Sequence, residues 1–352
     1  MPMNNMNMMN MGLQPAKDLG WTDQMCADIC MAVDAEAKRT KIAAQFLPRF
    51  EISMGEMGMS ERGMGMNHVA RRTIQHDAVA SQTASRLSIE EVDELSILEI
   101  WSEFSLTDPQ LKDEAMLKTA MTLAVVAANK LSRAEDLLIF QGRDGLKDPL
   151  FTNGTVGMRN APLNDGKLEV SNSLRFDGLL EKVPESHRIP VGATQANRDP
   201  SINRYGENTF GAVAKGYSIL QRSHYGRDAL ALPTNAFADT WAPLKTTLIM
   251  PADRIKGLVG DRFYSTSSLP NDFDGGNIPQ GVLVALDGNT MDLVMTVPPT
   301  VEYLQKSADP TTGGTHLLRV FERFALRLKD PNSVVSLEFQ KEETQEGTAP
   351  RF

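Results

Sequence analysis

The longest regular pattern in the sequence is a run of apolar positions between Pro109 and Gln141. Apolar side chains recur there at intervals of three and four, the period of an α-helix, at Met116, Ala120, Leu123, Ala127, Leu131, Ala134 and Leu138. A shorter row adds Leu117, Met121, Ala124 and Ala128. Asp108 is a suitable N-cap and Gly142 a suitable helix terminator. The pattern predicts one long helix whose middle is apolar nearly all round, so that much of its surface needs partners.

A second pattern, of period two, precedes this helix. Between Leu98 and Leu106 the apolar residues alternate with polar ones and with Trp101, as in a half-buried strand. We expect His68–Gln82 to form the other limb of a hairpin with this strand. Such a two-stranded arm is only marginally stable alone in water, so it should lie on a neighbour. Farther along, Asp287 and Gly288 separate two apolar runs and predict a hairpin turn.

Several segments in this order resemble a known family. The run Ser96–Gly142, with EFSLTDPQLKD and LSRAEDLLIFQG, resembles the extended loop and spine helix of encapsulin shell proteins and of tailed-phage major capsid proteins of the Hong Kong 97 type. Near the N-terminus, a segment is similar to the encapsulin N-terminal helix and the strand that follows it; its sequence is AKDLGWTDQMCADICMAVDAEAKRTKIAAQFLPRFEI. A later segment resembles elements of the axial domain, with the sequence NTFGAVAKGYSILQRSHYGRDALALPTNAFADTWAPL. Two more segments resemble the closing strands of the axial and peripheral domains, with the sequences GVLVALDGNTMDLVM and THLLRVFERFALRLKDPNSVVSLEF.

The resemblance implies an α+β fold with an N-terminal arm, an extended loop, a peripheral domain carrying the spine helix, and an axial domain. We expect the following division: 1–66, N-terminal arm and helix; 67–106, extended loop; 107–160, spine helix and peripheral domain; 161–305, axial domain with a polar insertion at about 160–205; and 306–352, closing strands of the peripheral domain and C-terminal tail.

The same resemblance implies a function. The chain is expected to be a structural subunit of an icosahedral shell, most simply the major capsid protein of a tailed bacteriophage that encloses double-stranded DNA. The alternative is an encapsulin shell that encloses a cargo enzyme. Three segments favour the phage coat because they exceed the compact encapsulin pattern: Met1–Met11, Ser53–Met66 and the polar insertion Asn160–Tyr205.

Methionine is concentrated near the N-terminus, where 13 of the 19 residues precede position 67. Its unbranched side chain adapts to irregular surfaces, which suits a strap that lies along a neighbouring subunit. Together with the predicted arm this gives eight expected intersubunit contact residues: Met6, Met9, Met57, Met59, Met64, Ile100, Trp101 and Phe104.

Charge and composition exclude several other functions. The net charge of −9 argues against enveloping or sequence-specific DNA binding. Cys26 and Cys30 lie one helical turn apart, which is poor disulfide geometry, and they are expected to be reduced thiols. The glycine-rich stretch Gly55–Gly65 lacks the residues of a phosphate loop, and the five histidines have no ligand spacing. We therefore expect no enzyme activity, no cofactor and no metal site.

The expected partners follow from the shell hypothesis. They are many copies of this chain in pentamers and hexamers, a portal, a separate scaffolding protein, and packaged DNA bound without sequence specificity, with a decoration protein left open. No apolar run is long enough for a membrane span and no signal peptide is visible. The chain is therefore expected in the virion, after synthesis and assembly in the cytoplasm of a bacterial host.

Overall fold

The structure is a computed structural model, and it separates into two compact units. The first contains Met1–Gly178 and Met291–Lys329, and the second contains Leu179–Thr290 and Asp330–Phe352. The residues described are 19–51, 68–70, 72–78, 85–90, 94–159, 163–164, 167–168, 175–193, 205–223, 226–243, 248–271, 278–309 and 313–340. Among these residues, no helix combines the length and the apolar composition that a membrane crossing requires.

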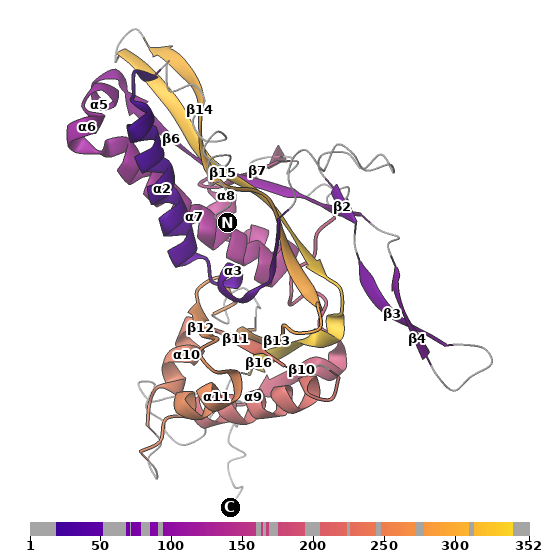
Figure 1. The fold of residues 1–352 in the computed structure, drawn as a ribbon. Helices are drawn as coiled ribbons and strands as arrows, with labels where there is room; N and C mark the ends of the chain where they lie inside the picture. The colour runs from indigo at the N-terminus through magenta and orange to yellow at the C-terminus, as the bar shows by residue number, and fades with distance from the viewer. Residues whose placement is uncertain are drawn as a thin grey trace, which may run out of the picture. The chain divides into compact units, whose positions relative to one another are not determined.

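The first unit is built on a five-stranded sheet (Figure 1). Its strands, in spatial order, are β1 (Arg49–Glu51), β14 (Met291–Asp309), β15 (Gly313–Leu328), β6 (Leu98–Thr107) and β7 (Gly157–Met158). Strands β14 and β15 form a long antiparallel ribbon, and β6 pairs with β15 over its whole length. The segment that leads out of the N-terminal helix therefore closes one edge of the sheet, parallel to β14.

Two helices pack together against this sheet. Helix α2 (Asp23–Thr40) lies beside α7 (Thr119–Gln141), as Figure 1 shows, and α7 also contacts β6 and β15. Residues 137–140, near the end of α7, are buried on every side, although the second apolar row ends at Ala128. In the middle of the helix, where the two rows predicted an apolar surface nearly all round, Val126 is 46 % exposed. Gly142 follows with φ 59°, so the predicted helix end is confirmed.

The predicted start of the long helix was wrong. The segment contains three helices, α5 (Asp108–Lys112), α6 (Glu114–Leu117) and α7, with a break at Lys118, whose φ of 51° lies in the left-handed region. The buried carboxylate of Glu114 accepts hydrogen bonds from Ala120 N at 2.7 Å and Met121 N at 3.1 Å, so it caps α7 at the break. Thr107, not Asp108, caps α5 through a reciprocal pair of bonds with Gln110.

The arm also differs from the prediction. Strand β3 (Thr73–Ala78) pairs with β4 (Ser85–Glu90), and β2 (His68–Ala70) pairs with β5 (Glu94–Ser96), both antiparallel. The strand at 98–106 is confirmed, but its assignment to the arm was wrong because its backbone pairs with β15 in the main sheet. The second limb of the hairpin is instead β4.

The second unit contains another five-stranded sheet and three helices. In spatial order its strands are β10 (Arg188–Val191), β16 (Val334–Phe339), β13 (Gln280–Ala285), β11 (Asp228–Pro233) and β12 (Phe263–Thr266). The helices are α9 (Gly206–Leu220), α10 (Thr234–Thr240) and α11 (Pro251–Val259), and the order helix α9, strand β11, helix α10 is the predicted one. Gly216 lets α9 approach the sheet closely, since a Cβ there would lie 3.1 Å from Val335 Cγ1.

The remaining helices and strands among the described residues are short. They are α3 (Ala43–Phe46), the 3₁₀ turns Gly142–Lys147, Glu185–His187 and Pro331–Ser333, α8 (Pro149–Thr152), β8 (Leu163–Asn164) and β9 (Lys167–Leu168).

The turn at Asp287 and Gly288 does not close a hairpin. Strand β13 belongs to the sheet of the second unit and β14 to the sheet of the first, so the turn lies where the chain passes from one unit to the other. The observed limits of the second unit, 179–290 and 330–352, also differ from the predicted 161–305. Strand β16 belongs to this unit because it pairs with β10 and β13.

We expect Glu114→Ala to lower the free energy of unfolding by about 1–2 kcal/mol, the usual effect of losing a helix cap. Two backbone N–H groups at the start of α7 would lose their acceptor. Thermal unfolding followed by circular dichroism measures the loss. Lys112→Ala, on the exposed side of α5, is the matched control and should change the stability by less than about 0.5 kcal/mol.

Candidate functional site

Five of the eight predicted contact residues lie outside the described residues. They are Met6, Met9, Met57, Met59 and Met64, so their role as intersubunit contacts stays a prediction.

The other three lie on β6 and are more deeply placed than predicted. Ile100 is wholly buried in its own chain, on the strand face that packs toward α7, and its role as an intersubunit contact stays a prediction. Trp101 and Phe104 are half-buried. A Cβ on Gly157 would lie only 2.4 Å from the indole ring of Trp101, so β7 runs directly against that ring. Trp101 therefore contributes to its own subunit's packing, whereas the arm interpretation placed it outside.

Beneath α2 and α7 the first unit holds a buried cluster of charges. The ammonium of Lys41 forms ion pairs with the carboxylates of Glu135, on α7, and Glu322, on β15. All three side chains are at most 3 % exposed. The second carboxylate oxygens of Glu135 and Glu322 have no hydrogen-bond partner within the described part of the chain. One ammonium therefore joins three segments that are far apart in the sequence.

The surroundings of Glu322 favour a proton on its carboxyl group. Burial raises the pKa of Glu322 well above its ordinary value, and the charge of Glu135 adds to the effect. Burial also opposes the charge on Lys41, but the two neighbouring carboxylates outweigh it and raise the pKa of the ammonium. Lys41 therefore stays charged, and the raised pKa of Glu322 favours the neutral form of that acid.

Asp136, the residue after Glu135, fixes the start of α3. Its carboxylate accepts hydrogen bonds from Ile42 N and Ala43 N, each at 2.9 Å. Burial raises the pKa of Asp136 to about 7 in spite of these bonds. Through Glu135 and Asp136, α7 thus holds the chain on both sides of the turn that follows α2.

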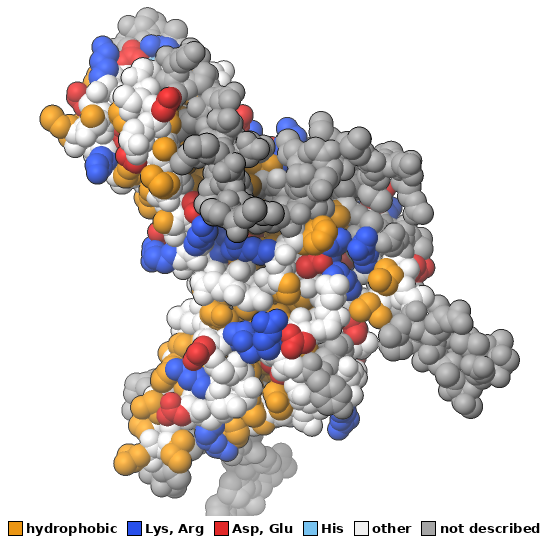
Figure 2. All heavy atoms as spheres, viewed as in Figure 1, with side chains coloured by type: hydrophobic (Ala, Val, Ile, Leu, Met, Phe, Trp, Pro, Cys, Tyr) orange, Lys and Arg blue, Asp and Glu red, His pale blue; other side chains and the backbone are white. Residues whose placement is uncertain are grey.

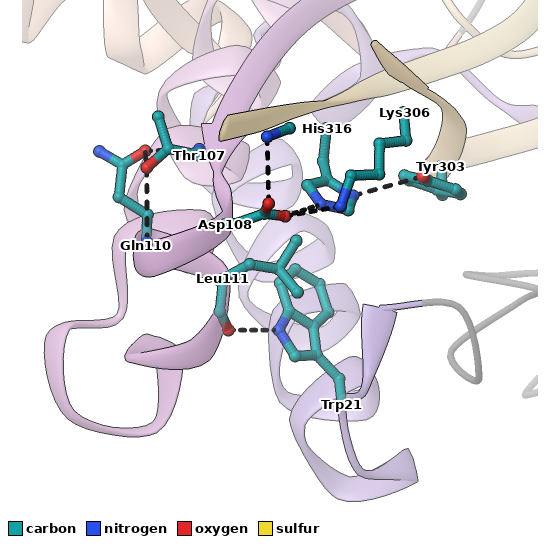
Figure 3. A network of polar contacts seen from close by, with 9 residues as sticks. Trp21, Thr107, Asp108, Gln110, Leu111, Tyr303, Lys306 and His316 are labelled. Atoms are coloured by element: carbon teal, nitrogen blue, oxygen red, sulfur yellow. Dashed lines mark hydrogen bonds and ion pairs between the residues drawn. The ribbon is translucent and has the colours of Figure 1, made fainter. Parts of the chain in front are cut away.

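A second polar network lies where β6 ends and α5 begins (Figure 3). The carboxylate of Asp108 accepts from His316 Nε2 at 2.7 Å, Lys306 Nζ at 2.9 Å and Gly314 N at 3.0 Å. The other ring nitrogen of His316 lies 3.3 Å from the hydroxyl of Tyr303. The hydrogen bonds from Lys306 and His316 hold the pKa of Asp108 well below its usual range. The network ties the end of the β14–β15 ribbon at which Asp309 pairs with Gly313 to the helix start.

The indole of Trp21 extends the same anchoring to the N-terminal segment. Its Nε1 donates to the carbonyl oxygen of Leu111 at 3.1 Å, which joins the residue just before α2 to the end of α5 (Figure 3). These polar contacts hold structural elements together. Among the described residues, no group of three or more His, Cys, Asp or Glu side chains is placed to hold a metal ion.

The surface carries apolar side chains that sequence reasoning had placed in contact with the core. Met116 and Leu117 belong to the predicted apolar rows, yet they are 83 % and 60 % exposed, because the chain breaks after α6. Figure 2 shows further hydrophobic side chains at the surface of each unit. The other large exposed apolar residues among those described are Met31, Phe50, Ile89, Val126, Leu248, Ile249, Ile278 and Leu304.

Comparison with known proteins decides the fold. Searches against protein-family models and against curated proteins found no match. Among solved structures, the virus-like particle from Pyrococcus furiosus matches with a TM-score of 0.55 at 13 % identity, covering 89 % of this chain and 98 % of that one. The chain has the Hong Kong 97-type fold.

Two further structures with weaker scores are similar to the chain. The capsid of an empty GTA particle gives a TM-score of 0.49 at 14 % identity, covering 86 % of this chain and 90 % of that one. The holo-SrpI encapsulin complex from Synechococcus elongatus gives a TM-score of 0.48 at 8 % identity, covering 85 % of this chain and 89 % of that one. The α+β class and the fold expected from the resemblance are thus confirmed by the first comparison.

Within this Hong Kong 97-type fold, the raised pKa values of Asp136 and Glu322 predict that the free energy of unfolding falls as the pH rises from 5 to 7. The folded-state pKa of Asp136, about 7, lies above its ordinary value of 3.8, and that of Glu322 is also raised. Each such group stabilises the fold fully below its unfolded pKa and loses that contribution as the pH rises through the folded value. The expected slope is at most about 1.4 kcal/mol per pH unit for each group.

Thermal unfolding measured across this pH range tests the predicted direction of the change in stability. Asp108 does not interfere, because its lowered pKa affects stability only in more acidic solution. Asp136→Asn keeps an acceptor for one of the two N–H groups and should flatten the dependence. A thermal unfolding midpoint that rises between pH 5 and 7 would contradict the raised pKa values of Asp136 and Glu322.

Replacing the shared cation should lower the stability of the fold directly. Lys41→Met would leave Glu135 and Glu322 buried together without a counter-charge, and removal of one partner from a buried pair costs about 3–5 kcal/mol. Chemical denaturation of the purified protein measures this loss. The matched control is Lys38→Met, because Lys38 lies three residues earlier, in the last turn of α2, and is exposed; we expect a change below about 0.5 kcal/mol.

Proposed function

We propose that this chain is a structural, non-catalytic subunit that assembles with many copies of itself into an icosahedral shell. The observation that carries the proposal is the fold similarity to the subunit of the Pyrococcus furiosus virus-like particle, which extends over 98 % of that chain. Because so little of either chain is left unmatched, the similarity concerns the whole architecture and not one shared motif.

The surface chemistry supports assembly. A two-stranded hairpin such as β3–β4 is marginally stable by itself in water, and Ile89 on β4 is 62 % exposed. Each unit also exposes several large apolar side chains, Leu248 of the second unit to 93 %. Groups of this kind are typical of surfaces that become covered by another protein. Contacts between identical copies around closed rings would bury them.

Within this class we propose the major capsid protein of a tailed bacteriophage that encloses double-stranded DNA. The support comes from the sequence, whose methionine-rich N-terminal segments and polar insertion near 160–205 exceed a compact encapsulin. The partners would be copies of the chain in pentamers and hexamers, a portal and a separate scaffolding protein. The net charge of −9 fits a container whose DNA is bound without sequence specificity. The proposed place is the virion, after assembly in the host cytoplasm.

The alternative within the same fold is an encapsulin that encloses a cargo enzyme. The observation in its favour is the likeness of the N-terminal segment 16–52 to the encapsulin N-terminal helix and strand. The two proposals agree on the shell and differ in what it contains. The contents of purified particles therefore separate them.

The test is to express the chain in a bacterium with and without its neighbouring genes, and to isolate particles by sedimentation. We expect closed shells by electron microscopy, correctly sized only when a scaffolding protein is present. Particles from the native source should contain nuclease-protected DNA. A bound ferritin-like or peroxidase cargo without DNA would favour the encapsulin. A stable monomer that turns over a substrate would overturn both proposals.

A further inference from the structure

The short helix α6 exposes two large apolar side chains side by side. Met116 is 83 % exposed and Leu117 60 % exposed, at the turn between α5 and α7. In Figure 2, hydrophobic side chains reach the surface in the region that Figure 1 labels α5 and α6. We call Lys112, Asp113, Met116, Leu117 and Lys118 together the α6 tip.

The local backbone holds this tip in a fixed conformation. Lys118 adopts φ 51° and ψ 37°, a left-handed conformation that residues other than glycine avoid. Such strain persists where the surroundings enforce it, and it concentrates at functional positions. Here the buried Glu114 enforces it by accepting the N–H groups of Ala120 and Met121 across the break. An uninterrupted helix would have directed Met116 along the core-facing row of α7.

The charges around the apolar pair find no opposite charge within the part of the chain that the structure describes. Lys112, Asp113 and Lys118 are exposed, and none of the three forms an ion pair with the described residues. Other exposed lysines of this unit do: Lys38 pairs with Asp34 at 2.6 Å and Lys147 with Asp144 at 2.6 Å. The tip thus presents an apolar centre with both signs of charge at its edge.

We propose that the α6 tip is a contact between copies of this chain, in which the tip of one copy meets the tip of another around a symmetry axis of the shell. This inference rests on the proposed function. Met116 and Leu117 of the copies pack together at the centre, and Asp113 of each copy pairs with Lys112 or Lys118 of the next. A surface with both charges and an apolar centre is complementary to itself, as contacts around a closed axis require. A nucleic acid would leave Asp113 repelled and the apolar pair unmatched.

The first experiment changes the apolar centre. In the double variant Met116→Asp/Leu117→Asp we expect at least a tenfold loss of particles in sedimentation. The subunit's circular dichroism and unfolding midpoint should not change, because both side chains are exposed. The matched control, Met116→Leu/Leu117→Met, keeps the positions apolar and should assemble like the wild type. Normal particle yields from the Asp variant would overturn the proposal.

The second experiment asks whether the partner surface is the same tip. Asp113→Lys makes the tip wholly basic, and Lys112→Asp/Lys118→Asp makes it wholly acidic, with Asp tolerated at the left-handed position better than most residues. Each variant expressed alone should repel its own copies and assemble poorly. Co-expression of the two should restore particles that contain both chains, as mass spectrometry of the particles would show.

The outcomes separate this contact from the proposed function. If the wild type forms shells and co-expression does not restore assembly, the tip docks on a different surface and the self-contact is wrong. If each charge variant assembles normally alone, the charges do not take part and the proposal fails as well. A wild type that forms no particles under any condition would overturn the proposed function, and this contact with it.

Discussion

The first unit depends on a single buried ammonium. Lys41 follows α2 in the chain, and its charge is shared between Glu135 on α7 and Glu322 on β15. Without water around them, these carboxylates could not remain in the interior unless a cation and protons compensate them. Hydrophobic packing alone would allow α2, α7 and the sheet to slide along one another, whereas a shared cation has one position. The cluster thus sets the register of three elements that the sequence separates widely.

The same logic of fixed polar contacts recurs at the other end of the unit. Asp108 connects the start of α5 to both strands of the β14–β15 ribbon, and Trp21 connects the N-terminal segment to α5. Each network joins elements through a hydrogen bond or ion pair with a defined geometry. Together the two networks connect the N-terminal segment, α5, α7 and the sheet of the first unit at both ends.

Much of the fold could be predicted from the sequence because its signals are local. The period of three and four around Leu131, the glycine after the helix, and the alternation from Leu98 to Leu106 all correspond to observed elements. The errors arose where a distant partner decided the outcome. Nothing local shows that β6 pairs with β15 and not with the arm, or that the runs flanking Asp287 belong to different sheets.

The candidate site was less predictable than the fold. The break at Lys118 depends on a carboxylate four residues earlier that reaches the next helix, and a count of apolar periods cannot detect it. It hid Met116 and Leu117 within a stripe that was read as core. Lys41, Glu135 and Glu322 are ordinary charged residues in sequence, and only the fold brings them together. Five methionines expected at the contacts lie outside the described residues.

The long ribbon of the first unit has one more consequence. The pairing of β14 with β15 shifts register at three places, between Met295 and Val297, between Val297 and Thr300, and between Tyr303 and Gln305. Extra residues of this kind let a strand bend and change its coiling without giving up the pairing on either side. Under the proposed function, a subunit placed in rings of five and of six would have to tolerate slightly different curvatures. These three irregularities give its longest ribbon places to flex while its helices keep their shape.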